Sequence, residues 1–130
     1  MAELILYTNP QSRGRIARWM LEEIGEPYQT EIVGYDQMKD ARYLAVNPMG
    51  KVPAIKHDGH VVTEVAAICA YLADVFPQAG LGPNSEEKAD YYRWLFMPPD
   101  RSSRRSRTIM QNGILQRSRA GCSATEASIT

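Results

Sequence analysis

Long apolar runs are missing from this 130-residue sequence. None of its apolar stretches approaches the ~20 residues that a helix needs to cross a bilayer, so we expect no membrane-spanning segment and no membrane partner. Residues 1–7 contain neither a basic stretch nor a small-residue cleavage site, which argues against a secretory signal and predicts a cytoplasmic location. The length suits one well-filled core rather than two.

Cysteine is also scarce, since the chain has only Cys69 and Cys122. The two lie far apart and match no metal-ligand spacing, so we expect reduced thiols, no metal site and no disulfide framework. The turn expected at residues 10–13 contains no cysteine, whereas redox chemistry of the glutaredoxin kind needs a C-x-x-C motif there. Any thiol chemistry must therefore use a thiol that the protein does not itself supply.

Aromatic residues and lysine are absent from residues 97–130. This segment has six arginines and two acidic residues, a net charge of +4, while the rest of the chain has nine basic and thirteen acidic residues, a net charge of −4. Such a segment buries too little apolar surface to offset its ordering entropy, so we expect a basic tail that is disordered or non-native. Without aromatic interleaving, its arginines give little reason to expect a nucleic-acid partner.

The apolar spacing in residues 1–96 predicts strands that alternate with helices. We expect strands at 4–7, 28–33, 52–56 and 60–62, and helices at 12–24, 36–46, 64–75 and 85–96. Thr63 or a neighbour should cap the third helix, and Gly59 should supply a positive φ in the hairpin turn. The βαβαββα order predicts an α/β fold of the thioredoxin-like kind, with helices on a mixed four-stranded sheet. Residues 1–77 would form this domain, 78–84 a linker, and 85–96 the first helix of a helical domain.

Four segments, in this order, resemble the N-terminal domain of glutathione S-transferases. They are Tyr7–Arg13, Asn47–Ile55, Thr63–Val65 and Ile68–Asp74. The resemblance covers about three quarters of the chain and implies a thioredoxin-like domain that holds glutathione. It also implies a detoxifying enzyme that transfers the glutathione thiolate to small electrophiles. Such an enzyme needs no cofactor besides glutathione as co-substrate, and it forms a homodimer.

The resemblance implies a set of glutathione-binding residues. The family places a cis-proline at Pro53, which turns the N–H and C=O of Val52 outward to pair with an extended tripeptide. Lys51, and less securely Lys39, would neutralise the glycyl carboxylate. Without the other motifs, Pro53 reads as an ordinary proline at a strand entry.

Glu64 and Val65 would bind the γ-glutamyl end of glutathione at the start of the third helix. A helix N-terminus favours a carboxylate, so the Val65 N–H would hold the γ-glutamyl carboxylate and the Glu64 carboxylate the ammonium. Most relatives have Ser or Thr where this chain has Val65, and loss of that hydroxyl weakens binding by ~1 kcal/mol. Glu64 could instead only favour the helix dipole.

Ser12 is the candidate catalytic residue, because its hydroxyl would stand at the start of the first helix, facing the bound thiol. Donation to the thiolate lowers the pKa of the glutathione thiol. Ser12 also suits a helix N-cap, and a cap that accepts through oxygen would leave the hydroxyl proton free. Tyr7 is the rival hydroxyl, and we interpret it as a packing residue.

Residues 97–130 do not resemble the all-helical domain that follows in the family. With the codons shifted by one base, permissible choices for residues 97–112 give a string that resembles the family's continuation. We therefore hypothesise a truncated chain with a frameshift near Phe96, which the nucleotide sequence would test. Two functions stay open: a glutathione transferase, impaired if the helical domain is missing, and a non-catalytic glutathione-binding or interaction module.

Overall fold

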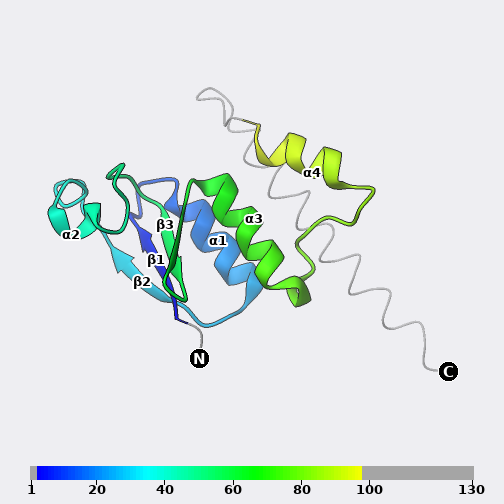
Figure 1. Cartoon of the computed structure of the whole chain (residues 1–130), viewed down its shortest axis with the longest axis horizontal. Coiled ribbons are helices and arrows are strands. Elements are labelled where there is room, and N and C mark those ends of the chain that lie inside the picture. Colours follow the sequence, from blue (N-terminus) through cyan, green and yellow to red (C-terminus); the bar gives the residue numbers. More distant parts are fainter. Residues whose placement is uncertain (1–2, 98–130) are drawn as a thin grey trace. The chain divides into compact units, whose positions relative to one another are not determined.

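A computed structural model describes residues 3–97, which separate into two units. The first unit ends at Ala79 and the second begins at Gly80 (Figure 1). The predicted tail from residue 98 onward, with the frameshift hypothesis that concerns it, lies outside the described residues. We describe each unit by itself.

A four-stranded mixed sheet forms the centre of the first unit. Its strands are β1 (Leu4–Thr8), β2 (Gln29–Ile32), β3 (Ala54–His57) and β4 (His60–Thr63). The order across the sheet is β2-β1-β3-β4, with β1 and β2 parallel and the other pairs antiparallel. The predicted mixed four-stranded sheet is therefore confirmed.

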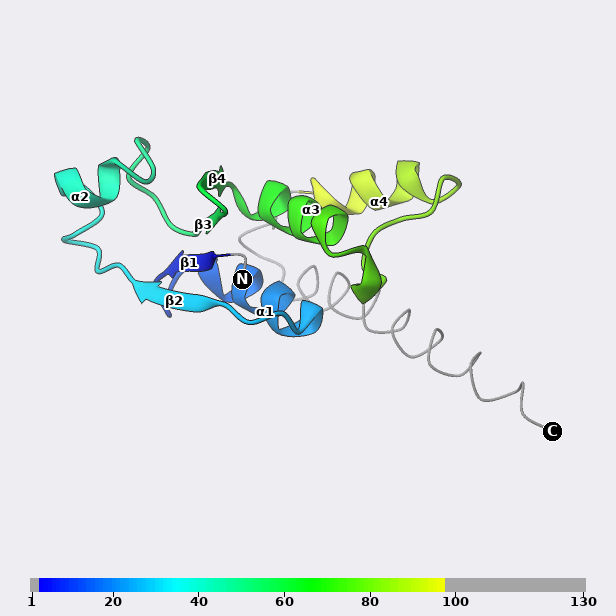
Figure 2. The ribbon, with the colours of Figure 1, turned by 60° about the horizontal axis from the view of Figure 1, so that its bottom comes forward.

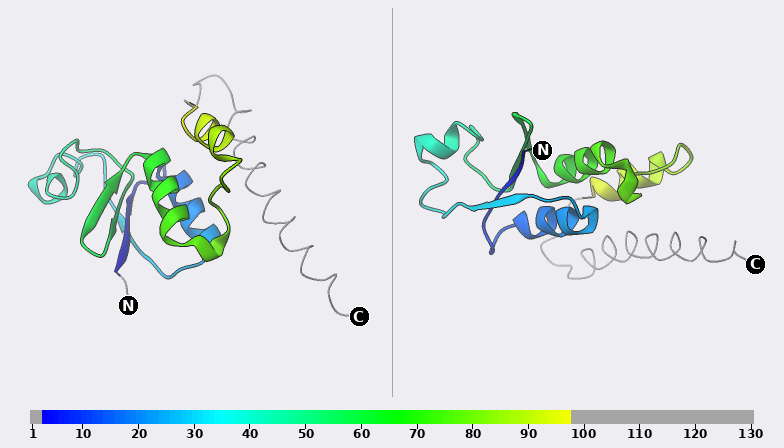
Figure 3. Two further views of the ribbon diagram at one scale, coloured as in Figure 1. Left: turned by 45° about the vertical axis from the view of Figure 1, so that its right-hand side comes forward. Right: turned by 90° about the horizontal axis from the view of Figure 1, so that it is seen from below.

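Two helices, α1 (Gly14–Ile24) and α3 (Val65–Val75), pack side by side against the sheet, as Figures 2 and 3 show. Leu6 and Ile55 are cross-strand partners, so their side chains share a face of the sheet, and both are fully buried. α1 contributes five buried residues at helical spacing and ends at Gly25, whose φ of 77° suits glycine.

Part of the opposite face of the sheet packs against the segment that contains α2 (Ala41–Leu44). Tyr7 and Ala54 are partners on this face. They form one buried cluster with Val33, Met38 and Tyr43. Each face of the sheet thus has its own apolar layer, as the alternation of side chains along β1 requires.

Several predicted boundaries were wrong by two or more residues. The first helix begins at Gly14 rather than residue 12, and the second spans 41–44 rather than 36–46. A turn precedes the second helix, because the Gln37 side chain accepts the Gly34 N–H at 3.0 Å. The N-cap of α3 is Glu64, the neighbour of Thr63, which lies within the predicted choice, but no side-chain hydrogen bond caps that helix.

The β3–β4 hairpin has a two-residue turn. His57 pairs with His60, which leaves Asp58 and Gly59 as the central residues. Their φ values are 47° and 83°, and positive φ at both central residues is what a type I′ turn requires. The prediction of a positive φ at Gly59 is confirmed.

After the 3₁₀ turn at Pro77–Ala79, the second unit contains α4 (Lys88–Leu95). The Asn84 side chain accepts the N–H groups of Glu86 and Glu87 at 3.1 and 3.0 Å, so it caps the turn before α4, which begins at Lys88 rather than at the predicted residue 85. In the part of the chain that the structure describes, no helix combines the length and apolarity needed to cross a membrane.

Candidate functional site

The strand register brings the predicted site segments to one edge of the sheet. Tyr7 pairs with Ala54, and Ala54 pairs with Thr63. Pro53 directly precedes this row and Glu64 directly follows it, while the loop into α1 leaves from the end of β1. The turn that contains Ser12, the Val52–Pro53 bond and the start of α3 therefore lie at the same edge.

The Val52–Pro53 peptide bond is cis, as predicted. Pro53 is buried, whereas Val52 is only partly buried. No hydrogen bond to the N–H or C=O of Val52 is present within residues 3–97. These two groups can therefore pair with an extended ligand, as the strands of a sheet pair with each other.

Two side chains fix the backbone just before Val52. Tyr43 Oη donates to the Lys51 carbonyl at 2.6 Å, and Asn47 Nδ2 donates to the same oxygen at 2.9 Å. Asn47 Oδ1 accepts the Met49 N–H at 3.1 Å. Burial of Tyr43 raises the pKa of its hydroxyl to about 12, so it remains a donor at neutral pH. The loop that presents Val52 is thus held from two sides.

Lys39 and Lys51 belong to the same loop region, and both are exposed. Lys39 Nζ donates to the Met49 carbonyl at 3.2 Å. Gly50 lies between them with a φ of 60°, and a Cβ there would stand 2.8 Å from the Met38 carbonyl oxygen. Glycine is needed at this position because neither the conformation nor the space admits a side chain.

Glu64 has an unusual backbone conformation, with φ 69° and ψ 127°. A non-glycine residue at positive φ is strained, and such strain is concentrated at functional sites. Its side chain is exposed, and its carbonyl accepts the first helical bond of α3 from the Ile68 N–H at 2.8 Å. The Val65 N–H lies in the first turn, where helix N–H groups have no partner within the helix.

Ser12 makes both a donor and an acceptor hydrogen bond. Its Oγ lies 2.7 Å from the Asn9 carbonyl oxygen, which has no hydrogen, so the hydroxyl is the donor. The same Oγ accepts the Gly14 N–H at 3.0 Å. Arg13, not Ser12 as expected, stands at the N-cap of α1, although the Ser12 hydroxyl accepts the N–H of the first helical residue. The expectation that the Ser12 proton is free was wrong, because the Asn9 carbonyl accepts it.

Asn9 joins the turn that contains Ser12 to the backbone just beyond β2, and we predicted no role for it. Its Nδ2 donates to the Val33 carbonyl at 3.1 Å, beyond the end of β2, and its Oδ1 accepts the Gln11 N–H at 3.0 Å. Its own carbonyl accepts the Ser12 N–H at 2.9 Å in addition to the hydroxyl. The side chain is buried, so each of its polar atoms is satisfied inside the protein.

Asn9 and Asn47 share a bonding pattern that the sequence could have shown. Each precedes a proline, accepts the N–H two residues on and donates to a more distant carbonyl. The first of these bonds is an Asx-turn, which Asn favours. The Asn-Pro pairs just before Ser12 and Val52 could therefore have indicated that these two asparagines hold the neighbouring turns. The carbonyls to which they donate could not be read from sequence.

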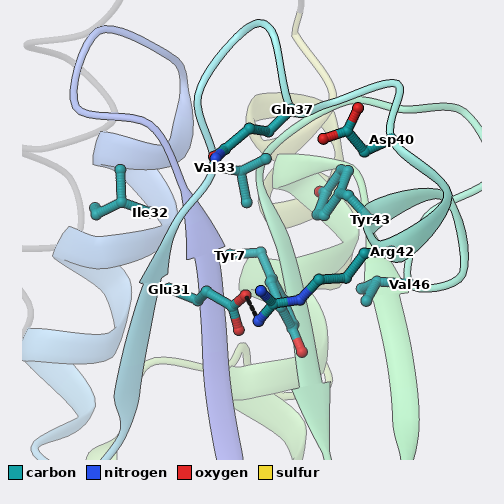
Figure 4. A pocket seen from close by; sticks show the side chains of 9 residues that line it. All are labelled: Tyr7, Glu31, Ile32, Val33, Gln37, Asp40, Arg42, Tyr43 and Val46. Carbon is teal, nitrogen blue, oxygen red and sulfur yellow. Dashed lines mark hydrogen bonds and ion pairs between the residues drawn. The ribbon is translucent and has the colours of Figure 1, made fainter.

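Tyr7 packs in the buried cluster beside α2 and not in the turn that contains Ser12. Its ring centroid lies 6.0 Å from that of Tyr43 in the buried cluster. It lines a cavity of about 500 Å³ between the strands and the α2 segment (Figure 4). Glu31 and Arg42 form an ion pair there at 2.9 Å.

Burial, then the negative charges of Glu31 and Glu3, raise the pKa of Tyr7, while the Arg42 charge lowers it. The net effect keeps the phenol protonated near neutral pH. Tyr7 is thus buried and packed as expected, and the choice of Ser12 over Tyr7 as the hydroxyl that acts on the thiol stays a prediction.

Cys69 is buried in α3, and burial raises the pKa of its thiol to about 11. A buried, protonated thiol is neither nucleophile nor metal ligand. Within residues 3–97 no group of three or more His, Cys, Asp or Glu side chains could hold a metal ion.

Comparisons with known proteins agree with this geometry. The family profile of the glutathione S-transferase N-terminal domain matches residues 13–75. Glutathione S-transferase GST-4.5 of Xanthomonas campestris is 34% identical over 92 residues, which are 69% of this chain and 45% of that protein. A glutathione transferase structure from Methylococcus capsulatus is 31% identical with a TM-score of 0.64, over 92% of this chain and 67% of the other. The chain belongs to the glutathione S-transferase family.

A glutathione transferase homologue from Sulfitobacter, solved with bound glutathione, matches with a TM-score of 0.67 and 26% identity, over 99% of this chain and 71% of the other. The thioredoxin-like fold of the glutathione S-transferases is therefore confirmed. The chain spans less than half of the length of the curated relatives that it matches.

Proposed function

We propose that this chain binds glutathione at the sheet edge described above and transfers its thiolate to a small electrophile. The observation that carries the proposal is the convergence at this edge of three features: the cis Val52–Pro53 bond, the N-terminus of α3 and the turn that contains Ser12. The glutathione-bound structure in the same family supports it.

The binding roles follow from the groups present. The N–H and C=O of Val52, next to Pro53, would pair with the cysteinyl unit of the tripeptide. The Val65 N–H would take the γ-glutamyl carboxylate at the positive end of α3, and the Glu64 carboxylate would take the ammonium. Lys51, with Lys39 nearby in the loop, would neutralise the glycyl carboxylate. Homodimerisation, a role in detoxification and a cytoplasmic location are further expectations of this function.

Ser12 would act on the sulfur. When its hydroxyl donates to the thiolate, the charged form is favoured and the thiol pKa falls, while the thiol proton leaves to solvent. The thiolate then attacks the electrophilic carbon and forms the carbon–sulfur bond. In a substitution the leaving group departs with the bonding electron pair, and in an addition the π electrons of the electrophile shift to its acceptor atom, which takes a proton from solvent. Tyr7 has no part in this step, because it is packed against Tyr43.

The test combines glutathione affinity with conjugation of a general electrophile. We expect binding and turnover by the wild type, loss of most turnover in Ser12→Ala, and near-normal turnover in Tyr7→Phe. Absence of glutathione binding would sink the proposal. Binding without turnover would favour the second candidate, a non-catalytic glutathione-binding or interaction module.

One observation favours that second candidate. The proton that Ser12 needs for the thiolate is donated to the Asn9 carbonyl. A chain that kept Ser12 in this state would hold glutathione without activating it. The turnover measurement separates the two functions.

A further inference from the structure

Ser12 has one proton and, once glutathione is bound, two possible acceptors. One is the Asn9 carbonyl oxygen, 2.7 Å from Ser12 Oγ. The other is the sulfur of the ligand, if the proposed function holds. A hydroxyl proton rotates about its C–O bond, but it serves one strong acceptor at a time. Activation of the thiol therefore requires the proton to leave the Asn9 carbonyl.

We propose that Asn9 is the positioning residue for the Ser12 hydroxyl, and that its carbonyl competes with the glutathione sulfur for the Ser12 proton. This inference rests on the proposed function. Asn9 would hold the turn so that Ser12 Oγ stays within reach of the sulfur, and its carbonyl would hold the hydroxyl proton until glutathione binds.

Rotation of the Ser12 hydroxyl away from the Asn9 carbonyl leaves no buried group without a partner. The Asn9 carbonyl keeps the Ser12 N–H at 2.9 Å. Ser12 Oγ still accepts the Gly14 N–H at 3.0 Å, because a hydroxyl oxygen accepts a hydrogen bond whichever way its own proton points. Rotation of the hydroxyl therefore exchanges one acceptor for another, and the thiolate, being charged, is the stronger one. No other bond breaks, and Ser12 retains its proton.

The side chain of Asn9 fixes this arrangement. It joins the turn to the carbonyl of Val33 and to the N–H of Gln11, at 3.1 and 3.0 Å. Asn9 is 8% exposed, so water does not replace these bonds easily. Without them, the turn would lose its side-chain link to Val33, just beyond β2, and Ser12 Oγ would be held less firmly.

The experiment measures the pKa of the glutathione thiol in complex with the full chain, from the ultraviolet absorbance of the thiolate as a function of pH. We expect Ser12→Ala to raise this pKa toward that of free glutathione, and Asn9→Ala to raise it by a large part of the same shift. At a pH well below the pKa, each increase of one unit in the thiol pKa lowers the thiolate population about tenfold. The double variant should equal Ser12→Ala, because Asn9 acts through Ser12.

Two further variants keep the test decisive. Asn9→Ser retains a weaker acceptor for the Gln11 N–H, so its thiol pKa should lie between those of the wild type and Asn9→Ala. This variant decides the matter if Asn9→Ala does not fold. Asn84→Ala is the control, because it removes comparable side-chain bonds before α4. We expect it to reduce stability without any shift of the thiol pKa.

The outcomes separate this proposal from the function on which it rests. If the wild type binds glutathione and lowers its thiol pKa while the Asn9 variants match the wild type, the positioning role is overturned and the proposed function stands. Additive shifts in the double variant would also overturn it. If the wild type does not bind glutathione, the proposed function and this inference both fail.

Discussion

Gly14, the first residue of α1, lies close to Thr8 at the end of β1. A Cβ at this position would lie 1.9 Å from Thr8 Oγ1 and 3.0 Å from Ser12 Oγ. Thr8 is β-branched and buried, so its side chain has little freedom to move away. Because Gly14 has no Cβ, the turn that contains Ser12 can lie against the end of β1. The sequence shows a glycine there, but not the side chain that would clash with a substitute.

Gly14→Ala should therefore destabilise the protein by about 2–3 kcal/mol, through overpacking next to Thr8. Urea unfolding followed by circular dichroism would measure the free energy of unfolding. The control is Gly14→Ala in a Thr8→Ala background, where the clashing oxygen is gone and the added loss should fall below about 1 kcal/mol. Equal losses in both backgrounds would contradict the steric explanation.

Cys69 predicts a loss of stability at alkaline pH. Burial raises its pKa from 9.0 to about 11, so above pH 9 the unfolded chain releases the proton while the folded chain retains it. The stability that depends on the protonated Cys69 thiol is fully present below pH 9 and is lost as pH rises toward 11. The loss in the free energy of unfolding amounts to about 2 kcal/mol by pH 11.

The measurement compares the free energy of unfolding of wild type and Cys69→Ala from about pH 8 to about pH 11. Wild-type stability should fall more steeply, and the difference between the two chains isolates the contribution of Cys69 from that of the groups they share. Parallel curves would show that Cys69 ionises equally in both states.

Among the elements, the two long helices of the first unit and the sheet could be predicted from sequence, because their apolar spacing matches their burial. α2 could not, because its predicted range included residues 36–39, where side-chain bonds such as that of Gln37 to the Gly34 N–H stabilise turns instead. The start of α4 was missed for a related reason. Asn84 caps a turn at residues 85–87, where the sequence predicted the first residues of the helix.

The candidate site shows the same division between what sequence can and cannot reveal. The cis bond at Pro53 and the position of Glu64 followed from motif order. The bond of Ser12 to Asn9 and the strain at Glu64 did not, because both depend on backbone geometry that no residue type specifies. The pairing of distant carbonyls with Asn9 and Asn47 depends on tertiary packing and stayed hidden for the same reason.

The loop before β3 gives a prediction at this scale. Asn47 is 4% exposed and makes two side-chain bonds in the loop, whereas the Tyr43 hydroxyl makes one. Asn47→Ala should lower the free energy of unfolding by about 2–3 kcal/mol and Tyr43→Phe by about 1 kcal/mol. Glutathione affinity should fall in the same order, because Val52 is presented by this loop.

Denaturant unfolding and glutathione titration by calorimetry would measure both effects. Tyr35→Phe is the matched control, since Tyr35 is 59% exposed and should tolerate loss of its hydroxyl. A larger loss of affinity in Tyr43→Phe than in Asn47→Ala would contradict the assigned order.

At the scale of the whole molecule, the buried core belongs to the first unit. Every buried hydrophobic residue among those described lies between Leu4 and Ala73. The segments that would hold glutathione also lie within this unit, from Ser12 to Val65. The second unit contributes α4 to the described structure, and its aromatic side chains Tyr92 and Phe96 are exposed.

Residues 1–79 should therefore fold alone and bind glutathione with an affinity within about threefold of the full chain, a difference of less than ~1 kcal/mol. Circular dichroism with a cooperative thermal transition would test folding, and calorimetry would test affinity. The Ser12→Ala variant of the same fragment serves as a control, because it should lower the thiolate fraction of bound glutathione and leave the fold intact. A fragment that lacks a cooperative transition would contradict the independence of this unit.

The row that joins Tyr7, Ala54 and Thr63 across three strands has a consequence for how the protein tolerates change. Val52 and Val65 would act through main-chain atoms, so exchange of their side chains should be mild. Deletion or insertion of one residue between positions 54 and 63 is different, because it shifts the pairing by one step and reverses the faces of the strand. Length variation in this hairpin, rather than substitution, is the change that would separate Pro53 from Glu64.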